Sequence, residues 1–310
     1  MKAYLKLARF DHWVKNFFIV PGIITAWMLV TVTWNVEHIL NLILGVMATC
    51  FIASANYVIN EWLDAEFDQY HPVKKHRPAV TQNLEVKYII VEYIMFAVAG
   101  LVLAFTVNLP FFCVEAVLLF MGIVYNVRPL RTKDIPYVDV LSESINNLLR
   151  LLLGWFIVVE VVLPPSSLML GYWMVGAFLM AVKRFAEYRM IDNPEVAGSY
   201  RKSFQKYTSV TLLCSAIFYA MCAVFLVGVF MIKYRVEYIV LIPLMIGIFV
   251  YYFYLSYKED SVVQKPEKLY REKGLLVLVG TFCVLFFTMT FLDVPVLEMI
   301  QSNALIQIGS

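Results

Sequence analysis

Carboxamide and carboxylate side chains recur every four residues near the end of a long apolar run, as Asn56, Asn60, Asp64 and Asp68. On an α-helix a step of four residues drifts by about 40°, so these side chains cover roughly one third of the circumference. Carboxylates on one face repel one another unless a cation lies between them, and Mg²⁺ takes one or two carboxylates together with phosphate oxygens and water. The spacing therefore predicts that Asn60, Asp64 and Asp68 hold Mg²⁺ on a diphosphate-bearing donor, with Asn56 as a substrate contact one turn deeper. The competing interpretation is a solvated helix end that is acidic by chance.

A second polar stripe opens a later apolar run. Asp139, Glu143, Asn146 and Arg150 fall within about 60° of one another on a helix, and Asn147 lies beside them. We expect Asp139 and Glu143 to complete the Mg²⁺ site and Asn146 and Arg150 to contact substrate. An arginine this far inside a membrane helix needs an anionic partner, which Glu143, Asp139 or a substrate phosphate could supply. A structural ion pair between helices is the alternative.

Basic residues accompany both stripes. A carboxylate-bound metal together with Lys and Arg side chains neutralises a leaving diphosphate, which carboxylates alone would repel. The candidate phosphate contacts are Lys74, Lys75 and Arg77 after the first stripe, Arg128, Arg131 and Lys133 before the second, and Lys183 with Arg184 further on. Each of these cations alone is also explained by membrane topology, because cytoplasmic loops are rich in Lys and Arg.

The composition indicates that a membrane positions these residues. Hydrophobic residues make up 61% of the chain, charged residues only 15%, and the mean hydropathy is +0.75. A soluble fold of 310 residues cannot bury that much apolar surface. We predict an all-α integral membrane protein, a single membrane domain over residues 1–310. Its nine spans are expected at about 17–34, 38–60, 88–107, 110–126, 139–163, 167–186, 209–232, 236–257 and 274–292.

The order of the spans predicts the orientation. Of the 25 Lys and Arg residues, all but Arg150, Lys233 and Arg235 lie at the N-terminus or in loops that nine spans place on its side. The positive-inside rule then puts the N-terminus and the active site in the cytoplasm and the C-terminus outside. We expect the membrane to be the cytoplasmic membrane of a prokaryote.

Several other classes of site find no support. The net charge of +2 gives no field that would attract nucleic acid. The five cysteines show no CxxC pair, and the four histidines show no metal-ligand spacing, so we interpret His12, His38, His71 and His76 as loop or interface residues. The oligomeric state stays open, and a homo-oligomer is compatible with the sequence.

The two stripes resemble the aspartate signatures of one enzyme family. Residues 60–68 (NEWLDAEFD) resemble the NDxxDxxxD motif of the UbiA superfamily of membrane prenyltransferases, with Glu61 where Asp is usual. Residues 139–143 (DVLSE) resemble its second DxxxD-type motif, with Glu143 in the last place. The resemblance implies a bundle of nine transmembrane helices, a cytoplasm-facing active site, a Mg²⁺ cofactor and transfer to or from an isoprenoid lipid.

Three shorter stretches resemble the branch that includes decaprenyl-phosphate phosphoribosyltransferase. They are residues 9–16 (RFDHWVKN, with Lys15), 133–139 (KDIPYVD) and 183–187 (KRFAE). In that branch the donor is phosphoribosyl diphosphate and the acceptor a polyprenyl phosphate. Tyr125 and Lys133 also resemble the Tyr, Pro and Lys loop of aromatic prenyltransferases, so transfer of a polyprenyl chain to an aromatic acceptor is the alternative.

The resulting hypothesis is a Mg²⁺-dependent phosphoribosyl transfer to a lipid phosphate. Asp64, Asp68, Asp139 and Lys133 are the expected catalytic residues, with Lys133, Arg77 or Lys74 drawing charge from the leaving diphosphate. Arg150, Lys183 and Arg184 are expected to hold the lipid phosphate. A transporter would instead show inverted repeats, which the sequence lacks, and a membrane terpene cyclase would not need a second cationic site.

Overall fold

Every regular element of the computed structural model is a helix, within residues 2–30, 32–258, 261–264 and 266–298, which are the residues the structure describes. In that part of the chain, eight helical segments are long and apolar enough to cross a membrane. The helix of the second polar stripe, α7 (Val138–Val158), is a further long helix. Each of the nine predicted apolar runs overlaps one of these helices, and the all-helical membrane fold is confirmed.

The long helices are joined by short helical turns. In chain order the elements are α1 (Lys2–Leu7), η1 (Phe10–Ile19), α2 (Val20–Val30), α3 (Val36–Asp68), η2 (Lys74–His76), α4 (Pro78–Thr81), α5 (Val86–Val107), α6 (Leu109–Asn126), η3 (Thr132–Asp134), α7, α8 (Ser166–Ile191), α9 (Pro194–Tyr200), η4 (Lys202–Gln205), α10 (Ser209–Tyr234), η5 (Val236–Leu241), α11 (Ile242–Leu255), η6 (Val262–Gln264), η7 (Pro266–Arg271), α12 (Lys273–Phe291) and α13 (Pro295–Glu298).

Local capping explains where several helices begin. The Asn35 side chain accepts a hydrogen bond from the backbone N–H of His38 at the start of α3, and Asn108 does the same for Phe111 at the start of α6. Helix α3 then continues to Asp68, beyond the predicted end at residue 60. Its 33 residues span about 50 Å, well over the roughly 30 Å of a bilayer core. The acidic last turns of α3 therefore extend beyond the apolar layer.

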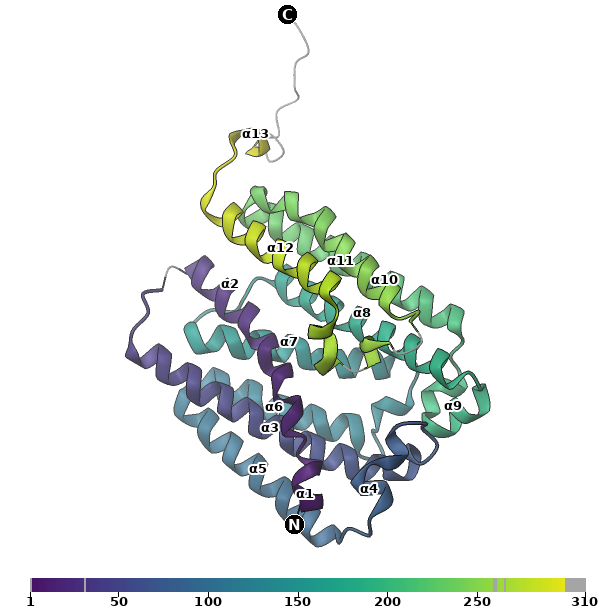
Figure 1. The fold of residues 1–310 in the computed structure, drawn as a ribbon. Helices are drawn as coiled ribbons and strands as arrows, with labels where there is room; N and C mark the ends of the chain where they lie inside the picture. The colour runs from purple at the N-terminus through teal and green to yellow at the C-terminus, as the bar shows by residue number, and fades with distance from the viewer. Residues whose placement is uncertain (1, 31, 259–260, 265, 299–310) are drawn as a thin grey trace, which may run out of the picture.

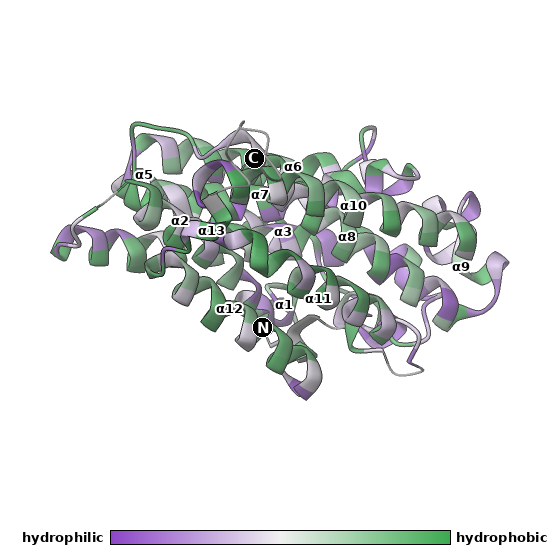
Figure 2. Cartoon of the chain, turned by 90° about the horizontal axis from the view of Figure 1, so that it is seen from above, coloured by the Kyte–Doolittle hydropathy of each residue, from purple (hydrophilic) through white to green (hydrophobic). Residues whose placement is uncertain are grey.

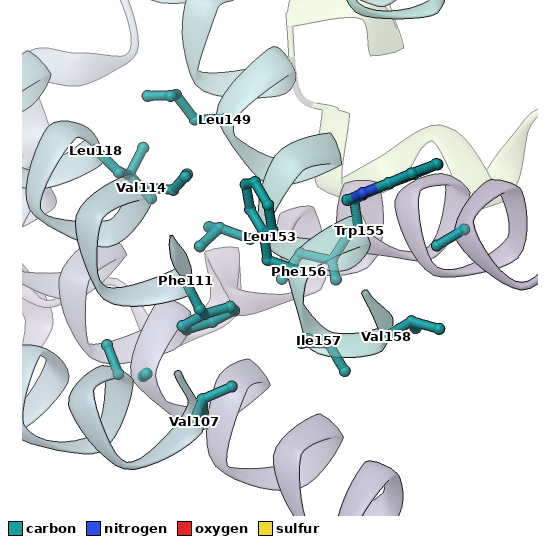
Figure 3. Packing of buried hydrophobic residues seen from close by; sticks show 14 of the residues in the cluster. Val107, Phe111, Val114, Leu118, Leu149, Leu153, Trp155, Phe156, Ile157 and Val158 are labelled. Atoms are coloured by element: carbon teal, nitrogen blue, oxygen red, sulfur yellow. The ribbon is translucent and has the colours of Figure 1, made fainter. Parts of the chain in front are cut away.

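Helix α7 lies in the middle of the bundle, between α3, α5 and α6 on one side and α8, α10 and α11 on the other (Figure 1). In its C-terminal half, Leu153, Phe156 and Ile157 belong to the same buried cluster as Phe111 of α6, and Trp155 points to the other side, toward α2 (Figure 3). Hydrophobic residues dominate along the long helices in Figure 2. A central helix with polar residues at one end and an apolar core at the other thus holds the two halves of the bundle together.

Two glycines allow α2 and α7 to pack backbone to backbone. A Cβ atom on Gly154 would lie 2.0 Å from the carbonyl oxygen of Ile19, and one on Gly22 would lie 2.0 Å from that of Leu151. Neither neighbour is a flexible side chain, so any larger residue would push the two helices apart.

We therefore expect Gly154→Ala to destabilise the protein, by about 1–3 kcal/mol as overpacked cores do. Gly247→Ala is the matched control, because nothing lies within 4 Å of its added Cβ. Thermal unfolding of the two purified variants in detergent checks the difference. Equal melting temperatures would contradict the close contact of α2 with α7.

Candidate active site

A cavity of about 720 Å³ opens among η1, α3, α6, α7 and α8. Most of the side chains predicted to contact metal or substrate line it. They are Lys15, Asn56, Asn60, Asp64, Asp68, Lys74, Arg77, Tyr125, Glu143, Asn146, Arg150, Lys183 and Arg184. The remaining candidates, Lys75, Arg128, Arg131, Lys133 and Asp139, do not line this cavity. The two polar stripes, nearly eighty residues apart, thus face one common space.

Asp64 and Asp68 of α3 face the cavity, and each is bound by at least one cation. Lys133 donates to Asp64 Oδ1, and Arg131 donates to the same oxygen over 3.0 Å. Asn60 Nδ2 donates to the other oxygen, Asp64 Oδ2, over 3.1 Å. Asp68 Oδ2 accepts from Arg77 over 2.7 Å. Helix α3 therefore presents a face on which negative charge is held at fixed positions by cations beside the cavity.

Lys133 and Arg131 contact Asp64 from outside the cavity. Both are buried, and Lys133 also donates to Asn126 Oδ1 over 2.7 Å. Burial lowers the pKa of Lys133 to about 8, although the Asp64 carboxylate opposes this shift. These two cations thus orient Asp64, and they do so from outside the cavity. Lys75 and Arg128 are exposed.

The second stripe divides into two parts. Asp139 is fully buried, and its carboxylate accepts from Tyr207 (2.8 Å), Ser203 (3.1 Å), Arg184 (3.3 Å) and Arg201 (3.4 Å). Protein donors surround both of its oxygens. We therefore leave Asp139 out of the proposed metal ligands and assign it to anchoring the segment around η4 beneath α7.

Glu143 faces the cavity, one turn further along α7. Its carboxylate accepts from Arg184, from Tyr125 over 2.8 Å and from Lys183 over 3.2 Å. The Arg184 side chain is 1% exposed and lies between Glu143 and Asp139. Arg184 thus cross-links α7 to α8 and leaves Lys183, on the same helix, as the more accessible cation of the pair.

Sequence reasoning missed a cluster around Glu187. Its Oε1 atom accepts from Lys74 over 2.6 Å and from Tyr200 over 3.0 Å, and His71 Nε2 lies 3.4 Å away. Burial lowers the pKa of Lys74, but Glu187 and Tyr200 outweigh that effect, so the pKa lies above its usual value. His71, interpreted from the sequence as a loop or interface residue, lines the cavity, as does Arg201 nearby. The only signal for this cluster was the 183–187 stretch, whose last residue is Glu187.

The N-terminal segment supplies a further basic edge. Arg9 donates to Glu61 over 3.2 Å, and Arg77 pairs with the same carboxylate oxygen. Lys15 lies 2.6 Å from His12 Nδ1, and both residues line the cavity with Arg9. Glu61, the departure from the family signature, is therefore buried in ion pairs that join the N-terminal segment before η1 to α3 and to the loop after it.

Comparisons with known proteins agree with the family resemblance of the two acidic motifs. A model of the UbiA prenyltransferase family matches residues 19–279. The chain belongs to the UbiA prenyltransferase family. It is accordingly an integral membrane transferase, and the sequence prediction of this family is confirmed.

Curated relatives include phosphoribosyltransferases. The chain is 27% identical to the decaprenyl-phosphate phosphoribosyltransferase of Corynebacterium glutamicum over 219 residues, which is 67% of this chain and 60% of the relative. It is 26% identical to nodulation protein NoeC of Azorhizobium caulinodans over 70% of this chain and 68% of that protein. The match therefore spans less than two thirds of the phosphoribosyltransferase's length.

Solved structures share the fold. A UbiA homologue from Archaeoglobus fulgidus bound to GPP and Mg²⁺ superposes with a TM-score of 0.69, at 20% identity, over 94% of this chain and all of that one. A digeranylgeranylglyceryl phosphate synthase structure gives a TM-score of 0.64 at 19% identity, over 93% of this chain and 98% of that one. At this level of identity the likeness establishes the helical arrangement of the family.

The cavity residues fit a divalent cation only together with a ligand. Among the described residues, no group of three or more His, Cys, Asp or Glu side chains is arranged to enclose a metal. Asp64 and Asp68 nevertheless give two carboxylates one turn apart on a single face, with the Asn60 carboxamide beside Asp64. Mg²⁺ prefers one or two carboxylates with phosphate oxygens and water, so this donor set suits Mg²⁺ carried on a diphosphate.

The anchoring role of Asp139 can be tested by stability. Asp139→Asn removes the buried negative charge between Arg184 and Arg201, and we expect a loss of about 3 kcal/mol, as when one partner of a buried pair is removed. The control is Asp134→Asn, whose partly exposed pair with Arg131 should contribute less than about 1 kcal/mol. Thermal unfolding of the purified variants distinguishes them. An unchanged melting temperature for Asp139→Asn would contradict the anchor.

Proposed function

We propose that this protein transfers a phosphoribosyl group from phosphoribosyl diphosphate to a polyprenyl phosphate and releases diphosphate. The observation that carries the proposal is the charge of the cavity. Within the described part of the chain, eight Lys and Arg side chains line it against four carboxylates. A cavity of this balance suits two phosphorylated substrates, and the likeness to a decaprenyl-phosphate phosphoribosyltransferase supports the same assignment.

The donor's diphosphate is assigned to the α3 face. Asp64 and Asp68, with Asn60, would hold Mg²⁺, which when bound neutralises diphosphate charge. Lys74 and Arg77 lie at the same end of the cavity and would take up the charge that develops on the departing diphosphate. Because Arg77 already binds Asp68 over 2.7 Å, it stands beside the place where that charge appears.

The acceptor is assigned to the side of the cavity between η1 and α8. Lys15 and Lys183 line that side together with apolar residues, among them Phe18 and Met180. The lysines would bind the lipid phosphate, and the apolar side chains would receive the first isoprene units. A phosphate oxygen of the acceptor forms the bond to the anomeric carbon as the bond from that carbon to the diphosphate breaks. The phosphate is ionised at neutral pH, so no protein base is required.

Transfer of a polyprenyl chain to an aromatic acceptor is the second candidate. The apolar lining that includes Leu179, Tyr252 and Leu269 would also suit an isoprenoid donor. A solved member of the fold is bound to GPP. The charge balance argues against this candidate, because a neutral aromatic acceptor leaves the second set of cations without a substrate anion.

We also propose that the cavity opens to the cytoplasm. The Lys and Arg residues concentrate at the N-terminus and in the loops at the acidic end of α3, and positively charged loops remain cytoplasmic. The soluble donor would then reach the carboxylates directly from the cytoplasm, while the lipid acceptor stays in the membrane.

The decisive assay compares two reactions of the purified protein with Mg²⁺. One contains radiolabelled phosphoribosyl diphosphate and polyprenyl phosphate, and the other contains polyprenyl diphosphate and a panel of aromatic acceptors. We expect label to enter the lipid phase in the first reaction and to stay out of it when EDTA is present. In that reaction Asp64→Asn and Asp68→Asn should each abolish turnover, because each removes a carboxylate from the α3 face. Near-normal activity of Asp64→Asn would contradict the metal assignment, provided that circular dichroism shows an intact fold.

Lys183→Ala tests the acceptor side separately. We expect the KM for polyprenyl phosphate to rise about tenfold, the usual effect of losing a charge-assisted contact, with little change in the KM for the donor. Lys202→Ala is the matched control, since Lys202 is an exposed lysine outside the cavity lining. An unchanged acceptor KM in Lys183→Ala would mean that this lysine does not bind the acceptor and serves only membrane topology and its ion pair with Glu143.

A further inference from the structure

The deep end of the cavity holds a group of polar side chains, Asn56, Asn146 and Arg150, which we term the deep subsite. At 1.5 Å per residue, Arg150 lies about 10 Å beyond Glu143 along α7, and Asn56 lies about 12 Å beyond Asp64 along α3. Both displacements run from the acidic end of the cavity into the bundle. The deep subsite is therefore separated from the carboxylates by about the length of a small substrate.

Arg150 differs from the other arginines of the cavity in its partners. Its Nε donates to Asn16 Oδ1 over 3.1 Å, and its Nη1 donates to the backbone oxygen of Asn146 over 3.2 Å. Both acceptors are neutral. Arg9, Arg77, Arg184 and Arg201 each pair with a carboxylate, whereas no described carboxylate lies within 4.0 Å of Arg150.

The buried acid of the neighbouring helix, Glu115, forms no ion pair with Arg150. Glu115 on α6 is fully buried, receives the hydroxyl of Thr49 and does not line the cavity. An unpaired arginine at this depth is costly, and such groups in membrane proteins mark binding sites. The cavity side of Arg150 is thus matched to an anion that a ligand brings.

The carboxamide oxygens of the deep subsite receive no hydrogen bond from the part of the chain that the structure describes. The Oδ1 atoms of Asn56 and Asn146 are buried and accept no hydrogen bond from the described residues. The Asn56 amide is held in place, because its Nδ2 donates to the backbone oxygen of Leu118 over 3.0 Å. Gly122 makes room for it, since a Cβ there would lie 1.9 Å from Asn56 Oδ1. Asn56 Oδ1 therefore lies against α6, whereas a ligand hydroxyl could satisfy Asn146 Oδ1, because buried acceptors without donors are rare.

We propose that the deep subsite recognises the sugar phosphate end of the donor. In this arrangement Arg150 binds the phosphate at the end of the ribose opposite the diphosphate, and Asn146 accepts a hydrogen bond from a ribose hydroxyl, while Asn56 shapes the wall against α6. The inference rests on the proposed function, and it replaces the expectation that Arg150 holds the lipid phosphate. An isoprenoid diphosphate has a charge at one end only and no hydroxyls, so it would leave Arg150 and Asn146 without partners. The deep subsite is therefore the part of the cavity that selects a phosphorylated sugar over a prenyl donor.

Binding measurements separate this end of the donor from the diphosphate end. The affinities of phosphoribosyl diphosphate and of inorganic diphosphate, each with Mg²⁺, are measured by calorimetry on the full-length protein in detergent. For Arg150→Met we expect about a tenfold loss of affinity for phosphoribosyl diphosphate and less than about a twofold change for diphosphate. Asn146→Ala should give a smaller loss in the same direction. Arg189→Met is the charge-matched control, because Arg189 is exposed and lies outside the cavity lining.

The outcomes distinguish the inference from the function on which it rests. If Arg150→Met and Asn146→Ala bind phosphoribosyl diphosphate as the wild type does, the deep subsite does not bind the sugar phosphate. The proposal of phosphoribosyl transfer is unaffected by that result. A raised KM for polyprenyl phosphate in Arg150→Met, with donor affinity unchanged, would show that Arg150 binds the phosphate of the acceptor instead. If the wild type binds phosphoribosyl diphosphate no better than diphosphate and transfers prenyl groups, the proposed function and the inference both fail. Circular dichroism of each variant shows whether it is folded, and Asn146→Ala keeps the test open if Arg150→Met is not.

Discussion

A charged side chain in the apolar interior of a membrane protein costs several kcal/mol unless an opposite charge neutralises it. The polar end of this bundle is organised by that constraint. Asp139 is fully buried between Arg184 and Arg201, and Arg184 reaches on to Glu143. The chain of alternating charges joins α7, α8 and the segment around η4, so that the helices can bring further charges to the edge of the cavity.

The two acidic motifs perform different tasks as a result. On α3, Asp64 and Asp68 face the cavity, and the cations that bind them come from the loops on either side of the site. On α7, the first carboxylate is used to hold the scaffold and only Glu143 faces the cavity. Motif symmetry in the sequence therefore does not imply symmetric roles, because Ser203 and Tyr207 enclose Asp139, whereas Asp64 and Asp68 line the cavity.

Periodicity was sufficient to predict the helices and the α3 face. Apolar runs of span length and a four-residue spacing are local properties, and α3 is one uninterrupted helix from Val36 to Asp68. The same helical arithmetic placed Asp139 with Glu143, and it could not reveal that Ser203 and Tyr207 would enclose Asp139 from more than sixty residues away. The pairing of Lys74 with Glu187 is equally long-range. Such contacts depend on how the helices pack, which no spacing within one segment encodes.

The ion pairs of Glu61 have an evolutionary consequence. In the family signature an aspartate is usual at this position, and its side chain is shorter by one methylene. Here the glutamate reaches both Arg9 of the N-terminal segment and Arg77 of the loop after α3. The residues at positions 9 and 61 should therefore have been inherited as a pair, so that homologues with the shorter acid carry a different residue at position 9. Covariation between these positions would trace how this lineage attached its N-terminal segment to the site.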